Sequence, residues 1–234
     1  MFYGVDPHAE NYMSFSPYAY VGNNPLIRID PDGRDWFGIN QEDGTIILLK
    51  PTEGNHRLYA GSGTNKDDFI IKGRNDFLEI KDKTMLPQLS EKTNMATAIQ
   101  DGSVFSGPVA NTLNSKEAYK IFKYAAKNSG VEWSYQEFID GSAAVATANM
   151  DWTTISGLDS KTNHGKVVAF DIHSHPGDTK TDLEPWKGGG RDYLRKDIFK
   201  YQNPNVKVWI YMPKAPNPNA RMLDIVNNKW IIQH

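Results

Sequence analysis

Two histidines in the C-terminal third of the chain have the residue type and the spacing that metal binding requires. His173 and His175 follow a short apolar run at residues 167–170. The run is brief and rich in β-branched and aromatic residues, so it predicts a buried strand. Side chains two residues apart on a strand point to the same face. The two imidazoles are therefore predicted to converge where Pro176 and Gly177 break the strand, and they could supply half of a tetrahedral zinc shell.

A catalytic zinc site also needs a third protein ligand and a water, and Asp192 is the best candidate for that ligand. It follows a glycine turn at residues 188–190 and opens a stretch with apolar residues at helical spacing. These residues are Leu194, Ile198 and Tyr201. One His-x-His pair in a chain with six histidines can also arise by chance, and histidines at strand ends are often ordinary surface or core residues. The apolar strand, the glycine-rich loop and the acid that opens a helix together favour the metal site.

The segment resembles the signature of the JAMM (JAB/MPN+) metallopeptidases. That signature consists of an upstream glutamate, a His-x-His-Pro stretch and a Ser-x-x-Asp stretch after a loop. His173, His175 and Pro176 match the central stretch. The resemblance implies a zinc ion held by His173, His175 and an aspartate, with a glutamate that activates the attacking water.

The aspartate position departs from the family pattern in two ways. The gap from His175 to Asp192 is longer than usual, and Gly189 stands where the family carries serine. Asp182, with Thr179 at the Ser-x-x-Asp spacing, is an alternative third ligand, but its gap is shorter than usual. Asp192 is preferred because a helix is expected to follow it, as the family layout requires.

The resemblance further implies a catalytic glutamate on a strand that follows a helix. Residues 131–135 predict such a strand, and Glu132 alternates there with the apolar residues on either side. On a strand of this kind a solvent-facing glutamate is the commoner case. Glu137, which lies beside a predicted turn, is the rival candidate. Glu132 is expected to take the proton of the attacking water and to pass it to the leaving amine.

The family's serine normally helps to hold the oxyanion. With Gly189 in that place, a backbone N–H or the nearby hydroxyl of Ser134 is expected to substitute. Asp171 and Ser174 are expected to lie just behind the metal ligands. Asp171 could instead simply solvate the end of the strand.

Several elements are predicted to carry these residues. A helix is expected over residues 114–130, with one buried stripe, an Asn114–Glu117 capping box and a stop at Gly130. The stripe consists of Ala118, Ile121, Phe122, Ala125 and Ala126. A returning strand is expected over residues 142–150.

The C-terminal region predicts a crossover unit and a hairpin. Residues 206–212 form a strong apolar run, so the predicted order from the histidine-bearing strand onward is strand, loop, helix, strand. Strands at residues 222–226 and 229–232 are expected to form a hairpin that turns at residues 227–228, two asparagines able to adopt positive φ.

A small β-rich lead-in is predicted over residues 34–83, before the histidine-bearing region. Short β-like runs there lie between Gly, Asn and Asp clusters. They cover residues 45–49, 57–60, 69–71 and 77–80. Residues 84–113 are mixed and polar and predict no definite structure.

Residues 1–33 are rich in tyrosine and predict extended pieces between turns. Within them, residues 6–33 resemble the C-terminal end of the RHS repeat-associated core, with the pattern DP-x-AE-x-Y-x-S-x-SPY-x-Y-x-x-NNP-x-x-x-x-DPDG. That resemblance implies a junction between a toxin-delivery shell and a variable C-terminal toxin. The expected division is an RHS remnant at 1–33, the lead-in at 34–83 and a JAB-like metallopeptidase domain at 84–234.

Length, charge and cysteine content narrow the function classes. The 234 residues are compatible with one or two domains and ample for a buried core. A formal net charge of -2 gives no electrostatic case for a nucleic-acid partner. The absence of cysteine excludes disulfides and thiolate zinc sites. No cleavable signal peptide and no membrane-spanning apolar run is visible, so no membrane partner is expected.

The expected fold is therefore α/β, with a mixed sheet and flanking helices that resemble the JAMM/MPN fold, preceded by the β-rich lead-in. The expected function is that of a polymorphic-toxin effector in competition between bacteria, acting as a Zn2+-dependent peptidase or isopeptidase. It is expected to be delivered without a cleavable signal peptide and to act in the cytoplasm of the target cell. The expected partners are a protein or peptide substrate, a cognate immunity protein and the RHS shell of a longer parent.

Two alternatives stay open. One is an RHS-delivered toxin of other chemistry, chiefly a nuclease, and the balanced charge counts against it. The other is a metal-free MPN-like binding scaffold, and the histidine pair with a candidate glutamate counts against that.

Overall fold

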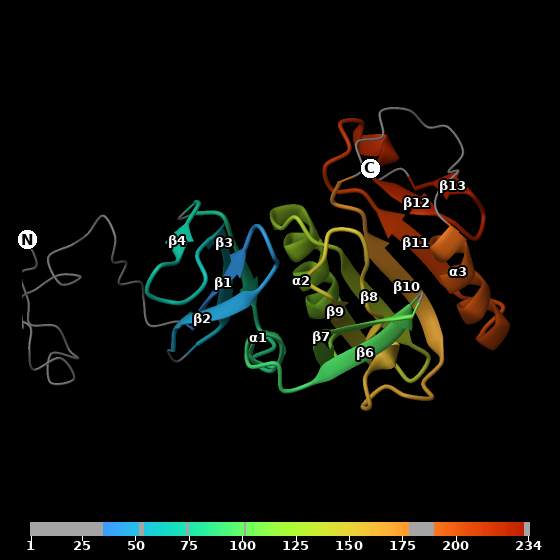
Figure 1. Ribbon diagram of the computed structural model, residues 1–234, viewed down its shortest axis with the longest axis horizontal. Coiled ribbons are helices and arrows are strands. Elements are labelled where there is room, and N and C mark those ends of the chain that lie inside the picture. Colours follow the sequence, from blue (N-terminus) through green and yellow to red (C-terminus); the bar gives the residue numbers. More distant parts are fainter. Residues whose placement is uncertain (1–34, 52–53, 74, 101, 178–189, 232–234) are drawn as a thin grey trace, which may run out of the picture.

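The computed structural model describes residues 35–51, 54–73, 75–100, 102–177 and 190–231 (Figure 1). The RHS-like run at residues 6–33 lies outside the described residues, as do Thr179, Asp182 and Gly189. The described chain forms two mixed sheets with few helices, so the expected α/β class is confirmed. No helix in the described ranges is both long and apolar enough to cross a bilayer.

The lead-in is a five-stranded sheet in which β2, β1, β3 and β4 lie in that order and β5 pairs with β3. Its strands are β1 (Trp36–Asn40), β2 (Ile46–Lys50), β3 (His56–Ser62), β4 (Ile70–Ile71) and β5 (Phe77–Ile80). β1 runs parallel to β3, and the other pairs are antiparallel. The sequence pattern does not predict β1, because Gly38 interrupts it. The glycine is needed there because a Cβ atom at Gly38 would lie 2.4 Å from the ring of Phe69.

The second sheet has eight strands in the order β13-β12-β11-β10-β8-β9-β7-β6. Only β10 and β11 pair in parallel; the other described pairs are antiparallel. The strands are β6 (Met95–Gln100), β7 (Ser103–Thr112), β8 (Trp133–Phe138), β9 (Ala143–Thr147), β10 (Val168–Ser174), β11 (Lys207–Tyr211), β12 (Met222–Asp224) and β13 (Lys229–Trp230). β10 is an interior strand, so both of its edges are held by neighbours.

The helices are α1 (Met85–Ser90), α2 (Ser115–Asn128) and α3 (Gly190–Gln202), with 3-10 turns η3 (Gly157–Asp159) and η4 (Pro218–Ala220). The structure therefore places α1, β6 and β7 in the region for which the sequence predicted no definite structure. The final hairpin is present as β12 and β13, and Asn228 adopts a positive φ of 50° as its turn requires.

The predicted helix is α2, but its capping differs from the expected box. The Asn114 side chain accepts a hydrogen bond from the Glu117 N–H at 3.2 Å. The return bond is not made, because the Asn114 N–H donates to the Thr112 hydroxyl at 2.8 Å. The Glu117 carboxylate instead accepts from the Lys81 N–H at 2.8 Å and from Lys120 at 2.8 Å. The predicted bond from the Asn114 N–H to the Glu117 carboxylate is thus replaced by a bond from Lys81 of the lead-in.

Helix α2 lies between the two sheets (Figure 1). Its buried stripe, with Phe122 at the centre, shares one core with Leu58 and Ile80 of the small sheet and with Trp133 and Tyr135 of the large one. The lead-in and the following residues therefore have a common hydrophobic core. Their division at residue 83 remains a prediction.

Helix α3 covers the other face of the large sheet and completes the predicted crossover from β10 to β11. Phe199 of α3 belongs to the same buried hydrophobic cluster as Val208 and Ile210 of β11. The apolar stripe from which the helix was predicted does not face the sheet. Its members, Leu194, Ile198 and Tyr201, are 61%, 50% and 92% exposed. The helix is present as predicted, but it is anchored by a different face.

Candidate metal centre

The end of β10 brings the two histidines to one face of the sheet. Ile172 and Ser174 alternate with them and point to the opposite face, where Ile172 joins the core beneath α2. His173 pairs with Ile210 of β11 on one side and with Ser134 of β8 on the other. His175 follows the strand, and its N–H donates to the Tyr211 carbonyl at 2.8 Å. The backbone that carries both imidazoles is therefore fixed by its neighbours.

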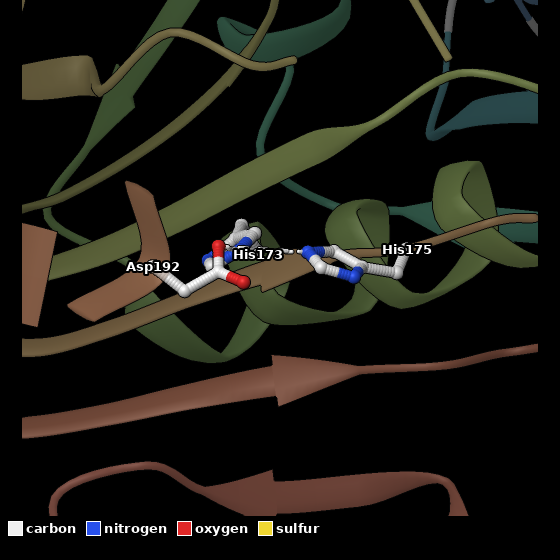
Figure 2. A group of neighbouring side chains, drawn as sticks. All are labelled: His173, His175 and Asp192. Carbon is white, nitrogen blue, oxygen red and sulfur yellow. Dashed lines mark hydrogen bonds and ion pairs between the residues drawn. The ribbon is translucent and has the colours of Figure 1, made fainter. Parts of the chain in front are cut away.

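The side chains of His173, His175 and Asp192 converge on one point (Figure 2). The two Nε2 atoms lie 3.1 Å apart. Asp192 Oδ1 lies 3.0 Å from His173 Nε2 and 3.7 Å from His175 Nε2. Ligand atoms on a tetrahedral zinc ion, at bonds of about 2.0–2.1 Å, are about 3.4 Å apart. The three atoms are thus spaced as ligands of a single ion.

The electrostatics of the group suit a divalent cation. Burial lowers the pKa of His173, so its imidazole is held in the neutral form that binds metals. Burial of Asp192 by itself raises the pKa of that carboxyl, but hydrogen bonds with the two histidines outweigh it and hold the pKa below its usual range. Two imidazoles and one carboxylate form the donor set of a catalytic zinc site with an open fourth position.

One contact typical of zinc-binding histidines is missing among the described residues. The second ring nitrogen of such a histidine usually donates to a carboxylate or a carbonyl, and this bond orients the ring. His173 Nδ1 is buried and has no hydrogen-bond partner in the described part of the chain. The donor atoms fit zinc even though this orienting bond is missing among the described residues. The ligands come from β10 and α3, so the contacts between these two elements set the geometry of the site.

Glu132 lies immediately before β8 and beside the histidines. The cross-strand pair His173–Ser134 continues by two residues to place His175 opposite Glu132. Glu132 Oε1 lies 3.9 Å from His175 Nε2, and the residue is only 8% exposed. The common alternative, a solvent-facing strand glutamate, does not apply to it.

Glu137 occupies the other end of β8. It pairs with Phe170 rather than with a histidine, and its carboxylate accepts a hydrogen bond from the Tyr135 hydroxyl. Five residues along a strand span roughly 16 Å, so Glu137 lies far from Glu132. The rival glutamate is not part of the cluster.

The two serines expected near the site, Ser134 and Ser174, are both buried, and the hydroxyl of each forms a hydrogen bond with the backbone. The Ser134 hydroxyl donates to the Ile155 carbonyl at 2.6 Å, so its proton is directed away from the metal ligands. The Ser174 hydroxyl accepts from the Trp133 N–H at 2.9 Å. Ser174 thus joins the end of β10 to the residue that follows Glu132.

Asp171 is fully buried and does not solvate the end of a strand. Its carboxylate accepts hydrogen bonds from Arg195 of α3 and from Gln136 of β8. Sequence reasoning missed both partners. The spacing of these residues in the sequence could have indicated them. Asp171 precedes His173 by two residues on a strand, so both side chains lie on one face of the sheet. Arg195 follows Asp192 by three residues on a helix, so both lie on one face of the helix.

Comparison with known proteins finds a similarity in the region around this cluster. Residues 110–202 match the family model of JAB-like toxin 1. The matched range runs from the end of β7 through α3 and contains Glu132, His173, His175 and Asp192. A search of curated proteins found no match, and a search of solved structures found none either. The α/β architecture is compatible with a JAB-like fold, and residues 110–202 of the chain are similar to the JAB-like toxins.

Proposed function

We propose that the protein is a toxin effector whose JAB-like region is a zinc-dependent peptidase or isopeptidase. The observation that carries this proposal is the convergence of one ligand atom each from His173, His175 and Asp192 within 4.8 Å. A similarity to JAB-like toxins over the same residues supports it independently.

Each residue has a distinct role in the proposed hydrolysis. His173, His175 and Asp192 would hold the zinc ion, which when bound supplies Lewis-acid activation of a water and of the scissile carbonyl. Glu132 accepts a proton from the attacking water and returns it to the leaving amine nitrogen, so that one water is consumed and one C–N bond is broken. Its position beside His175 places the carboxylate next to the ligand cluster.

No oxyanion donor is assigned among the described side chains, because the Ser134 proton is directed to Ile155. A backbone N–H at Gly189 is the donor proposed from the sequence. Such a donor is typically worth about 3 kcal/mol in the transition state, so its identity bears directly on the rate.

The proposed biological setting follows from the N-terminal sequence. The RHS-like run at residues 6–33 supports delivery as the C-terminal cassette of a larger RHS protein into a target cell, where the enzyme would act in the cytoplasm. A cognate immunity protein would then protect the producing cell. The net charge of -2 supports a protein substrate over a nucleic acid.

Metal analysis of the purified protein combined with a toxicity assay tests the proposal. We expect about one zinc per chain. We also expect growth arrest when the protein is expressed in a susceptible bacterium without an immunity protein. His173→Ala and His175→Ala should each lose the metal and the toxicity while keeping the fold, as judged by circular dichroism.

Two outcomes would overturn the proposal in different ways. A protein that binds no transition metal even after zinc is supplied would favour the metal-free scaffold. A protein that binds zinc but kills equally well as either histidine variant would indicate toxin chemistry elsewhere in the chain, with nuclease activity as the first to assay.

A further inference from the structure

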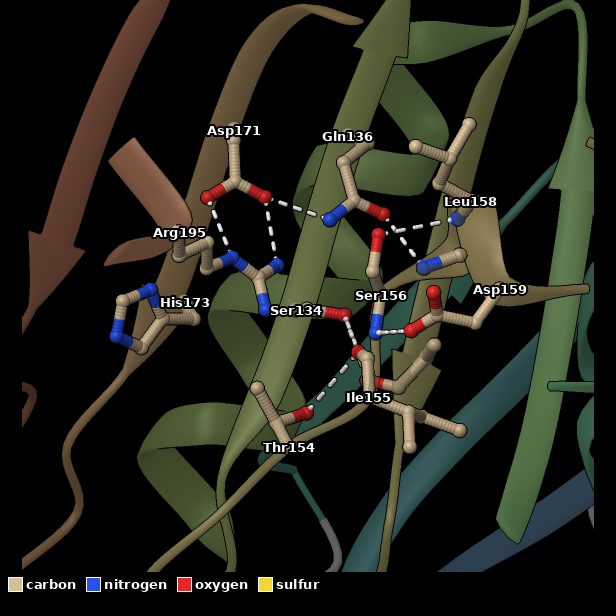
Figure 3. A network of polar contacts seen from close by, with 12 residues as sticks. Ser134, Gln136, Thr154, Ile155, Ser156, Leu158, Asp159, Asp171, His173 and Arg195 are labelled. Atoms are coloured by element: carbon tan, nitrogen blue, oxygen red, sulfur yellow. Dashed lines mark hydrogen bonds and ion pairs between the residues drawn. The ribbon is translucent and has the colours of Figure 1, made fainter. Parts of the chain in front are cut away.

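An ion pair between the partly buried Arg195 and the fully buried Asp171 lies directly behind the metal-binding cluster. Arg195 Nε donates to Asp171 Oδ2 at 2.9 Å, and Arg195 Nη2 donates to Asp171 Oδ1 at 2.6 Å. Gln136 Nε2 donates to the same Oδ1 atom at 2.6 Å (Figure 3). A fully buried carboxylate is stable only when it is paired and hydrogen-bonded, and the two-pronged contact with a guanidinium is the most directional form of such pairing.

The pair joins the same two elements that a metal ion must join. Asp171 lies two residues before His173 on β10, so both side chains point to the same face. Arg195 lies three residues after Asp192 on α3, which places both on one side of the helix. The ion pair therefore lies beside His173 and Asp192 and connects β10 to α3, the two elements that carry these ligands.

Two apolar contacts also hold the described part of α3 against the sheet: Tyr193, which is partly buried against the core, and Phe199. The outer residues Leu194 and Ile198 of α3 are exposed, and the buried anchor Phe199 lies two turns beyond Asp192. The Arg195 guanidinium lies 5.5 Å from the centre of the Phe199 ring. Within the described ranges, no group bonds to His173 Nδ1 to orient its ring. A directional link within one turn of Asp192 is thus well placed to fix that carboxylate.

Arg195 and Asp171 each neutralise the charge of the other beside the metal-binding cluster. An unpaired guanidinium beside the cluster would repel a divalent cation, and Asp171 neutralises it with both carboxylate oxygens. Gln136 extends the link to η3, because its Oε1 atom accepts from the Gly157 N–H at 2.6 Å. The polar chain thus reaches from α3 through β10 and β8, the strand that begins next to Glu132.

We infer that Arg195 is a positioning residue whose ion pair with Asp171 sets the distance between Asp192 and the histidines, and thereby the affinity and geometry of the metal site. This inference rests on the proposed function. It concerns how the site is assembled, and it assigns Arg195 no contact with the substrate.

The test measures metal affinity, coordination geometry and stability together. Zinc affinity is obtained by competition with a chromophoric chelator, geometry from the visible absorption of the cobalt(II) form, and stability from denaturant unfolding of the metal-free protein. Arg195→Gln should lower zinc affinity roughly 10–100-fold, as is typical when a residue that supports a metal ligand is lost. It should also weaken the absorption bands of tetrahedral cobalt.

Two further variants separate positioning from simple charge or folding effects. Arg195→Lys should recover only part of the affinity, because an ammonium group cannot make the two-pronged contact. Lys200→Gln removes the same charge from an exposed site on the same helix, and it should leave affinity and spectrum unchanged.

A paired apolar replacement keeps the inference testable if Arg195→Gln does not fold. Asp171→Leu combined with Arg195→Met removes both charges, and such replacements of buried ion pairs often preserve stability. The double variant should fold and still lose zinc affinity and the tetrahedral cobalt spectrum. Wild-type affinity and spectrum in that variant, or in a folded Arg195→Gln, would overturn the inference. A wild-type protein that binds no zinc would instead overturn the proposed function itself.

Discussion

Glu132 Oε1 lies 3.9 Å from His175 Nε2, although Glu132 directly precedes β8 and His175 directly follows β10. The pairing of β8 with β10 produces this proximity, because His173 stands opposite Ser134 and the next same-face positions are His175 and Glu132. A candidate proton acceptor is therefore positioned against the candidate metal ligands by backbone register.

Replacing Glu132 tests its role as the base. Glu132→Gln keeps the shape of the side chain but removes the proton acceptor, so zinc content should stay near the wild-type value. Activity should fall by about 10²–10⁴-fold, or roughly 3–5 kcal/mol in the barrier. Growth inhibition can be measured before a substrate is known. Glu137→Gln is the matched control and should keep its activity; a toxic Glu132→Gln beside a harmless Glu137→Gln would mean that the base has been assigned to the wrong residue.

The choice of third ligand is tested by two aspartate variants. Asp192→Ala should lose zinc affinity and activity, because the carboxylate lies 3.0 Å from His173 Nε2 at the start of a helix. Asp182→Ala should be tolerated, since three ligand atoms already converge among the described residues. Zinc titration of both variants provides the measurement. Loss of affinity in Asp182→Ala with retention in Asp192→Ala would transfer the ligand role to Asp182.

Ser174 is predicted to control the placement of Glu132. Ser174→Ala leaves the buried Trp133 N–H without its acceptor, which should cost about 1–3 kcal/mol in the free energy of unfolding. Since Glu132 is the preceding residue, activity should also fall, by up to about 10²-fold for a displacement near 1 Å, while zinc content is kept.

Ser129→Ala is the control for this effect, because Ser129 accepts a hydrogen bond from the ring nitrogen of the same tryptophan at 3.0 Å. It should cost comparable stability and leave activity intact. Equal losses of activity in the two variants would show that the effect is one of stability alone.

Lys123 predicts a pH dependence of stability. Its Nζ lies 3.7 Å from the centre of the Tyr211 ring, and burial, assisted by the charge of Arg221, lowers the pKa of Lys123 to about 8 from its ordinary 10.5. Below pH 8 the folded protein carries a poorly solvated charge. As the pH rises through 8, the folded state releases this proton before the unfolded state does, so stability rises.

Denaturant unfolding at pH values from about 7 to 9.5 should show a gain of roughly 1–2 kcal/mol for the wild type, after allowance for the favourable cation–π contact. Lys123→Met should remove most of this slope. An equal slope in the variant would assign the effect to other groups.

The features that the sequence alone determined depend on short-range geometry. Alternation along a strand is sufficient to place His173 and His175 on one face, and helical periodicity together with Asn114 is sufficient to predict α2. The helix that carries Asp192 was predicted in the same way. In each case the sequence pattern extends over one or two helical turns or along one strand. It can therefore be recognised without knowing which residues from distant parts of the chain pack against it.

The features that only the tertiary structure decided depend on partners far apart in the chain. The apolar residues of α3 indicate a helix but not its orientation, because the face that packs is chosen by Phe199 and by the bond from Arg195 to Asp171 on another strand. Strand pairing likewise decides that Glu132, and not Glu137, lies beside the histidines. Local periodicity specifies which residues share a face, whereas burial and hydrogen bonding between elements specify what each face meets.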